Sequence, residues 1–364
     1  MREREGTRRN IVGRGAASNP KNRFERIEVE PDPTELEEGD PRPETVYLRD
    51  HSRTIIARND SPDIGFDASV NPYRGCSHGC SYCYARPTHE YLGLSAGLDF
   101  ESRILVKEEA PELLREEVSS PRWELSSPRW EPKPLSMSGV TDPYQPVERR
   151  LRITRRCLEV LAGFRNPVVI VTKNHLVTRD IDLLRELADH DAAAVAVSLT
   201  TLDDDLRRVM EPRTSRPTRK LAAIEALAGA GVPVGVMTAP VIPSLNDHEL
   251  PDLISAAGRA GATFAAYVPV RLPYAVKPLF ENWLSRHFPD RKEKVLNRIR
   301  SMRGGKLNDP RFGSRMRGGG FFADHIAQIF SISCRRTGIE EGRFPKLSTA
   351  AFRESGGIQP GLFD

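Results

Sequence analysis

Three cysteines stand within eight residues, in the segment Cys76-Ser77-His78-Gly79-Cys80-Ser81-Tyr82-Cys83. Their spacings of four and three place the three thiols on one tight loop, and Gly75 and Gly79 supply the backbone freedom that such a loop needs. Thiolates select soft metals, namely zinc or the iron of iron–sulfur clusters. Any fold of this chain has to present three sulfur ligands side by side, and this requirement constrains it more than any other feature.

Two kinds of metal site fit the three cysteines. Structural zinc usually takes four protein ligands, and His78 inside the loop completes such a set, whereas Cys157 and Cys334 stand singly and far away. An iron–sulfur cubane held by three cysteines has one iron without a protein ligand, and an open coordination site is a functional feature. The spacing alone favours a metal site and leaves both kinds open.

The cysteine count and the lack of long apolar stretches favour the reducing cytosol. Five cysteines, an odd number, do not make a disulfide framework. The longest uncharged apolar stretch, Ala226 to Pro243, is shorter than the ~20 residues of a membrane-spanning helix and is broken by glycine and proline. Residues 1–5 are mostly charged and lack the apolar segment of a secretory signal. We therefore expect a cytoplasmic protein without a membrane partner.

Short apolar runs alternate with longer segments of helical periodicity through most of the chain. Such runs, separated by helices of about 10–15 residues, are typical of a parallel sheet that is covered on both faces or closed into a barrel. In both architectures ligands bind at the carboxyl ends of the strands, so the polar residues after each run are candidate site residues. The runs are 104–106, 135–137, 168–171, 194–197, 234–237 and 264–268.

Composition divides the chain into four parts. Residues 1–45 are rich in charge and proline and poor in large apolar side chains, so they are predicted to form a disordered tail. Residues 46–270 carry the alternating pattern and are predicted to form the core. Residues 271–338 are predicted to be a basic C-terminal extension over the open end of the core, and residues 339–364 a second flexible tail.

Positive charge is concentrated in the C-terminal extension. From Arg286 to Arg317 the chain has eleven basic and three acidic residues, which gives a local charge of +8, although the whole chain carries only +4. Such a concentration steers a polyanion such as nucleic acid toward one face. The alternative is a solvated surface whose charges are offset by acids elsewhere in the fold.

The cysteine segment, with aromatic Tyr82 before the last cysteine and an alternating β/α chain after it, resembles the radical S-adenosylmethionine (SAM) superfamily. The resemblance extends roughly from Tyr47 to Gly338 and implies an α/β fold, a partial (β/α)6 TIM-like barrel with the metal site after its first strand. More narrowly, Asn71–Cys76 and Cys83–Arg86 resemble the branch that includes spore photoproduct lyase and its "DNA repair photolyase" relatives of unassigned activity.

The resemblance implies a [4Fe–4S] cluster on Cys76, Cys80 and Cys83, with SAM chelating the fourth iron through its amino and carboxylate groups. One-electron reduction, by a donor such as flavodoxin or ferredoxin, then cleaves SAM to methionine and a 5′-deoxyadenosyl radical that abstracts hydrogen from a substrate. We therefore expect an enzyme of unassigned reaction that acts on nucleic acid, with a peptide or protein substrate as the alternative. A different class of protein, a zinc-stabilised nucleic-acid-binding protein, stays open through His78.

The resemblance also implies SAM contacts at the ends of the predicted strands. Thr141 and Asp142 match the segment after the second barrel strand, where the superfamily holds the SAM amino group. Lys173 corresponds to a SAM-contacting lysine of the lyase branch, whose charge balances the carboxylate. Ser198 corresponds to a ribose or carboxylate contact, and Arg213 is a candidate for a similar contact.

Two tyrosines flank the last cysteine, and the resemblance implies adenine packing for Tyr82 and a radical relay for Tyr84. Each candidate also has an ordinary structural interpretation: Lys173 as a solvated lysine, Ser198 as a turn former, and Tyr84 as a wall of the core. One departure from the branch concerns the reaction. Spore photoproduct lyase has a hydrogen-returning cysteine just before the SAM-binding hydroxyl, whereas residues 136–140 here contain no thiol.

Overall fold

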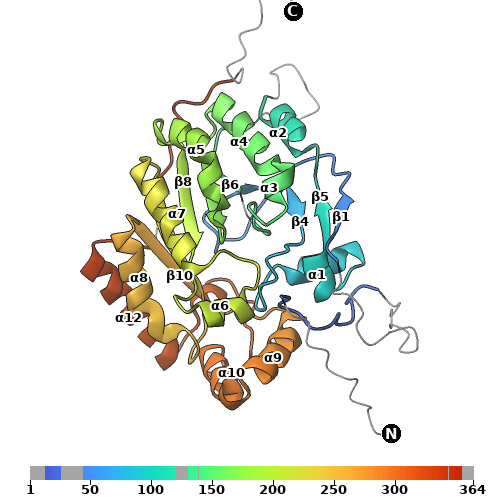
Figure 1. The fold of residues 1–364 in the computed structure, drawn as a ribbon, viewed down its shortest axis with the longest axis vertical. Helices are drawn as coiled ribbons and strands as arrows, with labels where there is room; N and C mark the ends of the chain where they lie inside the picture. Colours follow the sequence, from blue (N-terminus) through green and yellow to red (C-terminus); the bar gives the residue numbers. More distant parts are fainter. Residues whose placement is uncertain (1–12, 26–43, 120–129, 138, 343, 355–364) are drawn as a thin grey trace, which may run out of the picture.

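The computed structural model describes residues 13–25, 44–119, 130–137, 139–342 and 344–354 (Figure 1). This part of the chain contains an eight-stranded sheet of order β11-β10-β9-β8-β7-β6-β3-β2 and a three-stranded sheet of order β1-β5-β4. The strands are β1 (Val46–Arg49), β2 (Ile56–Arg58), β3 (Ala68–Val70), β4 (Tyr73–Arg74), β5 (Arg103–Val106), β6 (Leu135–Met137), β7 (Val168–Thr172), β8 (Ala193–Ser198), β9 (Val234–Val241), β10 (Phe264–Pro269) and β11 (Glu340–Glu341).

The larger sheet is an open parallel sheet of the predicted kind. β3 and β6 to β10 pair in parallel with their neighbours, β11 extends the sheet in parallel, and β2 pairs antiparallel at the other end. The sheet stays open between β2 and β11. The α/β fold class is therefore confirmed. Five of the predicted strands lie within β6 to β10, whereas the run 104–106 lies in β5 of the smaller sheet.

Helices alternate with the strands and cover the sheet along its length. Figure 1 shows α4, α5, α7 and α8 in sequence beside the strands, α12 beyond α8, and α6, α9 and α10 together at one end. Among the described residues, every helix is too short or too polar to span a lipid bilayer. The helices are α1 (Leu98–Ser102), α2 (Ala110–Ser119), α3 (Glu148–Leu151), α4 (Ile153–Phe164), α5 (Ile181–Ala188), α6 (Asp204–Met210), α7 (Pro217–Gly229), α8 (Leu250–Arg259), α9 (Val276–His287), α10 (Lys292–Met302), α11 (Ser314–Arg317) and α12 (Phe321–Thr337), with 3-10 turns η1 (Arg86–Leu92), η2 (His175–Asp180), η3 (Asp247–Glu249) and η4 (Pro289–Arg291).

Burial explains why the central strands appear as continuous apolar runs. All six residues of β8, Ala-Ala-Val-Ala-Val-Ser, are buried. A parallel strand that is covered on both faces needs apolar side chains at consecutive positions, and not only at alternate ones. Its neighbours β7 and β9 are also largely buried, and together with α4, α5, α7 and α8 they form the main hydrophobic core. This core holds the carboxyl ends of the strands in fixed positions.

A second hydrophobic core lies under the first part of the C-terminal extension. Trp283 of α9 and Ile299 of α10 are buried in the same cluster as Met210 of α6 and two residues of the cysteine segment, Cys80 and Tyr82. These helices therefore cover the end of the sheet at which the cysteine segment lies. The rest of the extension is placed differently, because α12 packs beside α8 and joins the main core.

The N-terminal segment 13–25 differs from the prediction of a disordered tail. Gly15 and Ala16 donate backbone hydrogen bonds to the buried carboxylate of Glu101, at 3.0 and 2.8 Å. A Cβ on Gly15 would lie 1.6 Å from the carbonyl oxygen of Gly79, so only glycine permits this approach to the cysteine segment. Polar partners rather than apolar burial order the segment, which is why a composition argument misses it. The rest of the predicted tail, 1–12 and 26–43, lies outside the described residues.

The chain after residue 338 also packs on the core as far as residue 354. The ring of Phe352 stacks on Phe164 of α4 at 6.2 Å, and that of Phe344 lies 5.0 Å from Phe264 of β10. The backbone N–H of Arg353 donates to the carbonyl of Phe164 at 2.8 Å. Two aromatic anchors thus order a segment that was predicted to be flexible. Residues 355–364 lie outside the described part of the chain.

The close pairing of β9 and β10 predicts that Gly235 tolerates no side chain. A Cβ there would lie 2.3 Å from the ring of Phe264 and 2.4 Å from its carbonyl oxygen. We expect Gly235→Ala to lower the free energy of unfolding by about 1–3 kcal/mol, because the strand has to shift to relieve overpacking. Gly229→Ala, at the exposed end of α7 with no atom within 4 Å of the added Cβ, is the control and should lose no stability. Equal urea midpoints for the two variants would contradict this account.

Candidate functional site

The cysteine segment forms a compact loop between β4 and η1. Gly75 and Gly79 have positive φ values of 81° and 68°, which the turn requires and which L side chains rarely adopt. Cys76 N–H donates to the carbonyl of Phe100 at 2.9 Å, and Cys83 N–H donates to the carbonyl of Cys80 at 3.3 Å. Cys76 and Phe100 belong to one small apolar cluster, against which Cys83 packs. The three predicted ligands therefore lie on one loop whose backbone is fixed at both ends.

The fully buried ion pair of Arg86 and Glu101 supports this loop. Arg86 donates through Nε and Nη2 to the carbonyl of Cys80, at 3.0 and 2.9 Å, and through Nη1 to the carbonyls of Ala96 and Gly97. Its Nη2 also donates to Glu101 at 2.9 Å. All five guanidinium N–H groups thus have acceptors. Since neither charged side chain has any exposed surface, the loop is tied to a part of the core that excludes water.

Burial sets the chemistry of the three thiols. Burial raises the pKa of Cys83 to about 11, although Arg86 opposes the shift. The pKa of Cys80 is raised well above its usual range by burial and by the charge of Glu211. Without a metal the thiols of Cys80 and Cys83 stay protonated at neutral pH, and a bound cation supplies the charge that stabilises thiolates. A donor set of three closely spaced, largely buried thiols fits a positively charged iron–sulfur cluster.

His78, the fourth ligand of the zinc alternative, lies beside the Cys76 thiol and also has partners outside the cysteine segment. Its Nδ1 lies 3.3 Å from Asp142, and its Nε2 lies 3.4 Å from the side-chain nitrogen of Asn174. Within the described residues no group of three or more His, Cys, Asp or Glu side chains is arranged to hold a single metal ion. A cubane cluster spans four irons and keeps its ligands farther apart than a single ion does, so this spacing is compatible with the cluster.

Three predicted SAM contacts converge beside the loop on a residue that the sequence analysis missed. Lys173 Nζ, after β7, donates to Ser198 Oγ at the end of β8 at 2.8 Å and to Glu211 at 2.9 Å. The Tyr82 hydroxyl also donates to Glu211, and Lys173 Nζ lies 5.6 Å from the centroid of the Tyr82 ring. The structure thus brings Tyr82, Lys173 and Ser198 together around one buried carboxylate.

Two lysines keep Glu211 ionised. Lys220 of α7, which is almost fully buried, donates to its second oxygen at 2.8 Å, and the hydroxyls of Thr200 and Thr214 also donate to the carboxylate. Burial alone would raise the pKa of Glu211, but Lys173 and Lys220 outweigh it and hold that pKa well below its usual range. With two lysines and one carboxylate, the group carries a net charge of +1 when all three are ionised.

A signal for Glu211 was present in the sequence, because the acid follows the apolar pair Val209-Met210 and precedes Pro212, two residues before a candidate arginine. Its partner Lys220 lies nine residues away on the next helix. No pattern of spacing connects Glu211 to Lys173 of another strand. Only the fold brings these residues together.

The remaining candidates are placed as follows. Thr141 is buried and donates to the carbonyl of Tyr73 at 2.9 Å. Asp142 accepts from Lys173 N–H and from Thr172, both at 2.7 Å, so its carboxylate already has protein partners. Arg213 is half-buried, and its side chain donates to Thr45 at 3.2 Å. Its backbone N–H donates to the carbonyl of His78 in the cysteine segment at 3.2 Å, so its backbone, and not its side chain, joins it to the site.

Tyr84, the candidate for a radical relay, lies at the outer side of the loop. Its side chain is 51% exposed, so it does not form a wall of the core. Its hydroxyl donates to the carbonyl of Gly139, after β6, at 3.3 Å, and the guanidinium of Arg271 lies 5.6 Å from its ring centroid. Tyr84 therefore lies next to the stretch 136–140, where no thiol is present.

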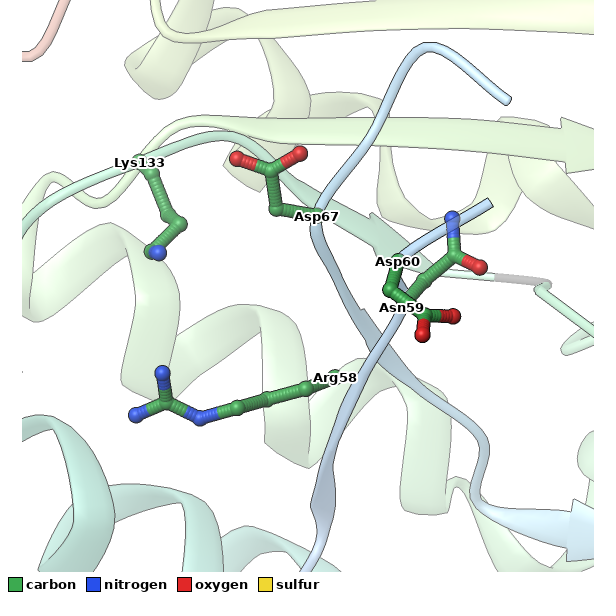
Figure 2. A pocket seen from close by; sticks show the side chains of 5 residues that line it. All are labelled: Arg58, Asn59, Asp60, Asp67 and Lys133. Atoms are coloured by element: carbon green, nitrogen blue, oxygen red, sulfur yellow. The ribbon is translucent and has the colours of Figure 1, made fainter. Parts of the chain in front are cut away.

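A separate hollow of about 430 Å³ lies at the opposite ends of the strands. Figure 2 shows the amine of Lys133 and the guanidinium of Arg58 directed toward the same space, with Asp67 and Asp60 nearby. Asp67 precedes β3 and Lys133 precedes β6, so the hollow is at the amino ends of these strands, away from the cysteine loop. Two cations and two carboxylates balance one another there, and it forms no part of the candidate site.

Comparison with known proteins identifies a family whose sequence profile matches this chain. The sequence profile of the radical SAM superfamily matches residues 70–257, which is slightly more than half of the chain. An uncharacterized protein of Mycobacterium tuberculosis is 38% identical over 62% of this chain and 65% of its own length, and one of Methanocaldococcus jannaschii is 25% identical over 63% and 79%. The chain thus spans just under two thirds of the mycobacterial relative.

Solved structures of spore photoproduct lyase are similar in fold. The complex with dinucleoside spore photoproduct has a TM-score of 0.59 and 16% identity, and the match covers 81% of both chains. A mutant with bound AdoMet and dinucleoside spore photoproduct gives the same TM-score and identity over 82% of both chains. At this identity the likeness concerns the fold alone.

The charge balance around Glu211 predicts its contribution to stability. We expect Glu211→Gln to lower the free energy of unfolding by about 3–5 kcal/mol, because it leaves the buried Lys220 and the partly buried Lys173 without a counter-charge. The control is Glu109→Gln, which removes an exposed ion pair with Arg49 and should change stability by less than about 0.5 kcal/mol. Urea unfolding of both variants tests this. A Glu211→Gln protein as stable as the wild type would contradict the role of Glu211 as counter-charge to the two lysines.

Proposed function

The chain belongs to the radical SAM superfamily, and we propose that it cleaves SAM reductively at a [4Fe–4S] cluster held by Cys76, Cys80 and Cys83. One observation carries this proposal: three largely buried thiols on a single loop adjoin the group of Lys173 and its partners. Three sulfur ligands and a neighbouring cation suit a cluster with one open iron and an anionic ligand on it.

The residues around the loop have separate roles in holding SAM. Lys173, whose side chain keeps some exposure, would pair with the SAM carboxylate, because its group carries the extra positive charge. Ser198, which accepts from Lys173, would bind the ribose, and Tyr82, which donates to Glu211, would pack on the adenine. The backbone around Thr141 and Asp142 would hold the amino group, since their own side chains have protein partners. Arg213 remains a candidate for a more distant contact.

With the cluster bound, one electron passed to SAM would generate a 5′-deoxyadenosyl radical for hydrogen abstraction. The chain's own contribution is to exclude water and to hold the ligand carboxylate against Lys173. We propose that a flavodoxin or ferredoxin supplies the electron. The odd cysteine count supports the reducing cytoplasm as the place where this occurs.

Nucleic acid is the substrate that we propose. The positive charge of the C-terminal extension, whose helices α9 and α10 cover the same end of the sheet as the cysteine loop, supports a polyanionic substrate. A peptide or protein is the alternative. Hydrogen return from a cysteine beside the SAM site does not fit this chain, because residues 136–140 have no thiol, so we do not propose the reaction of spore photoproduct lyase itself.

Metal analysis tests the cluster directly. The anaerobically reconstituted protein should contain about four irons and four sulfides per chain and show a brown absorbance. Cys76→Ala should lose the iron, the sulfide and the brown absorbance, because it removes one of the three cysteine ligands. The matched control is Cys157→Ala, since Cys157 is fully buried in the main core and should leave the iron content unchanged. One zinc per chain without sulfide would instead support the zinc-stabilised nucleic-acid-binding protein.

Removal of the cation should weaken SAM binding without removing the cluster. We expect Lys173→Met to raise the Kd for SAM by at least about tenfold, or ~1.4 kcal/mol, because the SAM carboxylate loses its counter-charge. Equilibrium dialysis with reconstituted protein measures the Kd, and the iron content is measured on the same sample. Lys346→Met, at an exposed lysine on the C-terminal segment, is the control. An unchanged Kd would remove Lys173 from the proposed site.

A further inference from the structure

Three arginines of the C-terminal extension lie close together near the cysteine loop. Arg271 follows the carboxyl end of β10, Arg303 follows α10, and Arg315 is in α11. Burial lowers the pKa of Arg271, and the neighbouring charge of Arg315 lowers it further. The pKa of Arg303 is lowered by burial and by Arg271. The three guanidinium groups therefore repel one another, and each needs acceptors.

Two of these arginines have their acceptors within the protein. Arg303 donates to four backbone carbonyls, of residues 269, 270, 314 and 315, at 2.9 to 3.5 Å. Arg315 is ion-paired with Asp63 at 2.5 Å and also donates to Ser61. Their charges are thus used to fix the segment around α11 against the core.

Arg271 lacks such partners. Its one hydrogen bond within the described part of the chain runs from Nη1 to the thioether of Met316 at 3.2 Å, and sulfur of this type is a weak acceptor. Its Nε is buried with no partner, and none of the described carboxylates forms an ion pair with it. A half-buried guanidinium with only one weak hydrogen bond still has N–H donors that can bind an anion.

The position of Arg271 connects it to the proposed reaction. Its guanidinium lies over the ring of Tyr84, the residue after the last cysteine, so an anion on Arg271 would lie beside the cysteine loop. Two exposed rings flank this place: Tyr84, and Phe312, which is 60% exposed with Arg315 at 4.5 Å from its centroid. Exposed aromatic rings beside cations are typical of surfaces that bind single-stranded nucleic acid, where bases stack and phosphates pair with arginine.

We propose that Arg271 binds a backbone phosphate of a nucleic-acid substrate, and that Tyr84 and Phe312 stack against its bases. The guanidinium fork matches a phosphate in two parallel hydrogen bonds, and its weak hydration favours this pairing in a partly buried place. The inference rests on the proposed function, because it assumes that the substrate approaches the cysteine loop. It adds to that function a specific phosphate contact and the single-stranded form of the substrate.

Fluorescence anisotropy with a labelled single-stranded oligonucleotide of about ten nucleotides tests the contact. We expect Arg271→Gln in the reconstituted protein to raise the Kd about tenfold and to reduce the slope of log K against log salt by about 1. Arg271→Lys keeps the positive charge but loses the forked guanidinium. Its Kd should therefore lie between those of the wild type and Arg271→Gln. The matched control is Arg311→Gln, at an exposed arginine paired with its neighbour Asp309, which should bind as the wild type does.

Five results separate this inference from its rivals. Wild-type affinity in a folded Arg271→Gln protein would overturn it, and so would equal losses in Arg271→Gln and Arg311→Gln. A wild-type protein that binds an acidic peptide or a mononucleotide as tightly as the oligonucleotide would also overturn it. A loss of SAM affinity in Arg271→Gln without loss of oligonucleotide affinity would assign Arg271 to SAM instead. Oligonucleotide binding through Arg271 without 5′-deoxyadenosine formation from SAM would support the contact while the proposed function fails.

Discussion

The buried ion pair of Arg86 and Glu101 fixes the geometry on which the candidate site depends. A loop with two left-handed glycines has no regular secondary structure of its own, so its shape has to come from its surroundings. Arg86 holds the carbonyl of Cys80 twice, and Glu101 receives Arg86 together with the backbone of Gly15 and Ala16. Taking both charges out of water is costly, and full hydrogen bonding offsets that cost. One pair thus joins three segments that lie far apart in the sequence.

On the other side of the loop, Glu211 organises charge in a different way. Glu101 has one arginine and backbone donors, whereas Glu211 has two lysines of unequal exposure. Lys220 is almost fully buried and keeps the carboxylate ionised, while Lys173 reaches the same carboxylate from a more accessible position. The group therefore carries its surplus positive charge on the lysine that a ligand can reach. An anionic ligand on Lys173 would complete the charge balance of a group that is otherwise one negative charge short.

Periodicity and motif predicted the parts of the molecule that local sequence determines. The runs behind β6 to β10 are continuous and apolar because both faces of those strands are covered, and the cysteine triplet needs no partner from elsewhere to be recognised. The order of the N-terminal segment was not predicted. It depends on the contact of Gly15 with Gly79 and on the distant carboxylate of Glu101 rather than on apolar burial. Glu211 was missed for the same reason: its partners Lys173, after β7, and Lys220, in α7, belong to different elements, and only the fold brings them together.

The basic stretch shows why a local count of charge is an incomplete guide to a binding surface. Two of its arginines pair with acids outside it, Arg315 with Asp63 and Arg298 with Asp247, so part of its charge is offset within the fold. Arg271, whose buried Nε has no hydrogen-bond partner and whose side chain forms no ion pair within the described residues, lies fifteen positions before the stretch begins. A ligand contacts residues that are neighbours in the folded structure, and these need not be neighbours in the sequence. What recruits an anion to a particular place is therefore the guanidinium that the fold has left unsatisfied, and the surrounding paired arginines serve to hold the surface in shape around it.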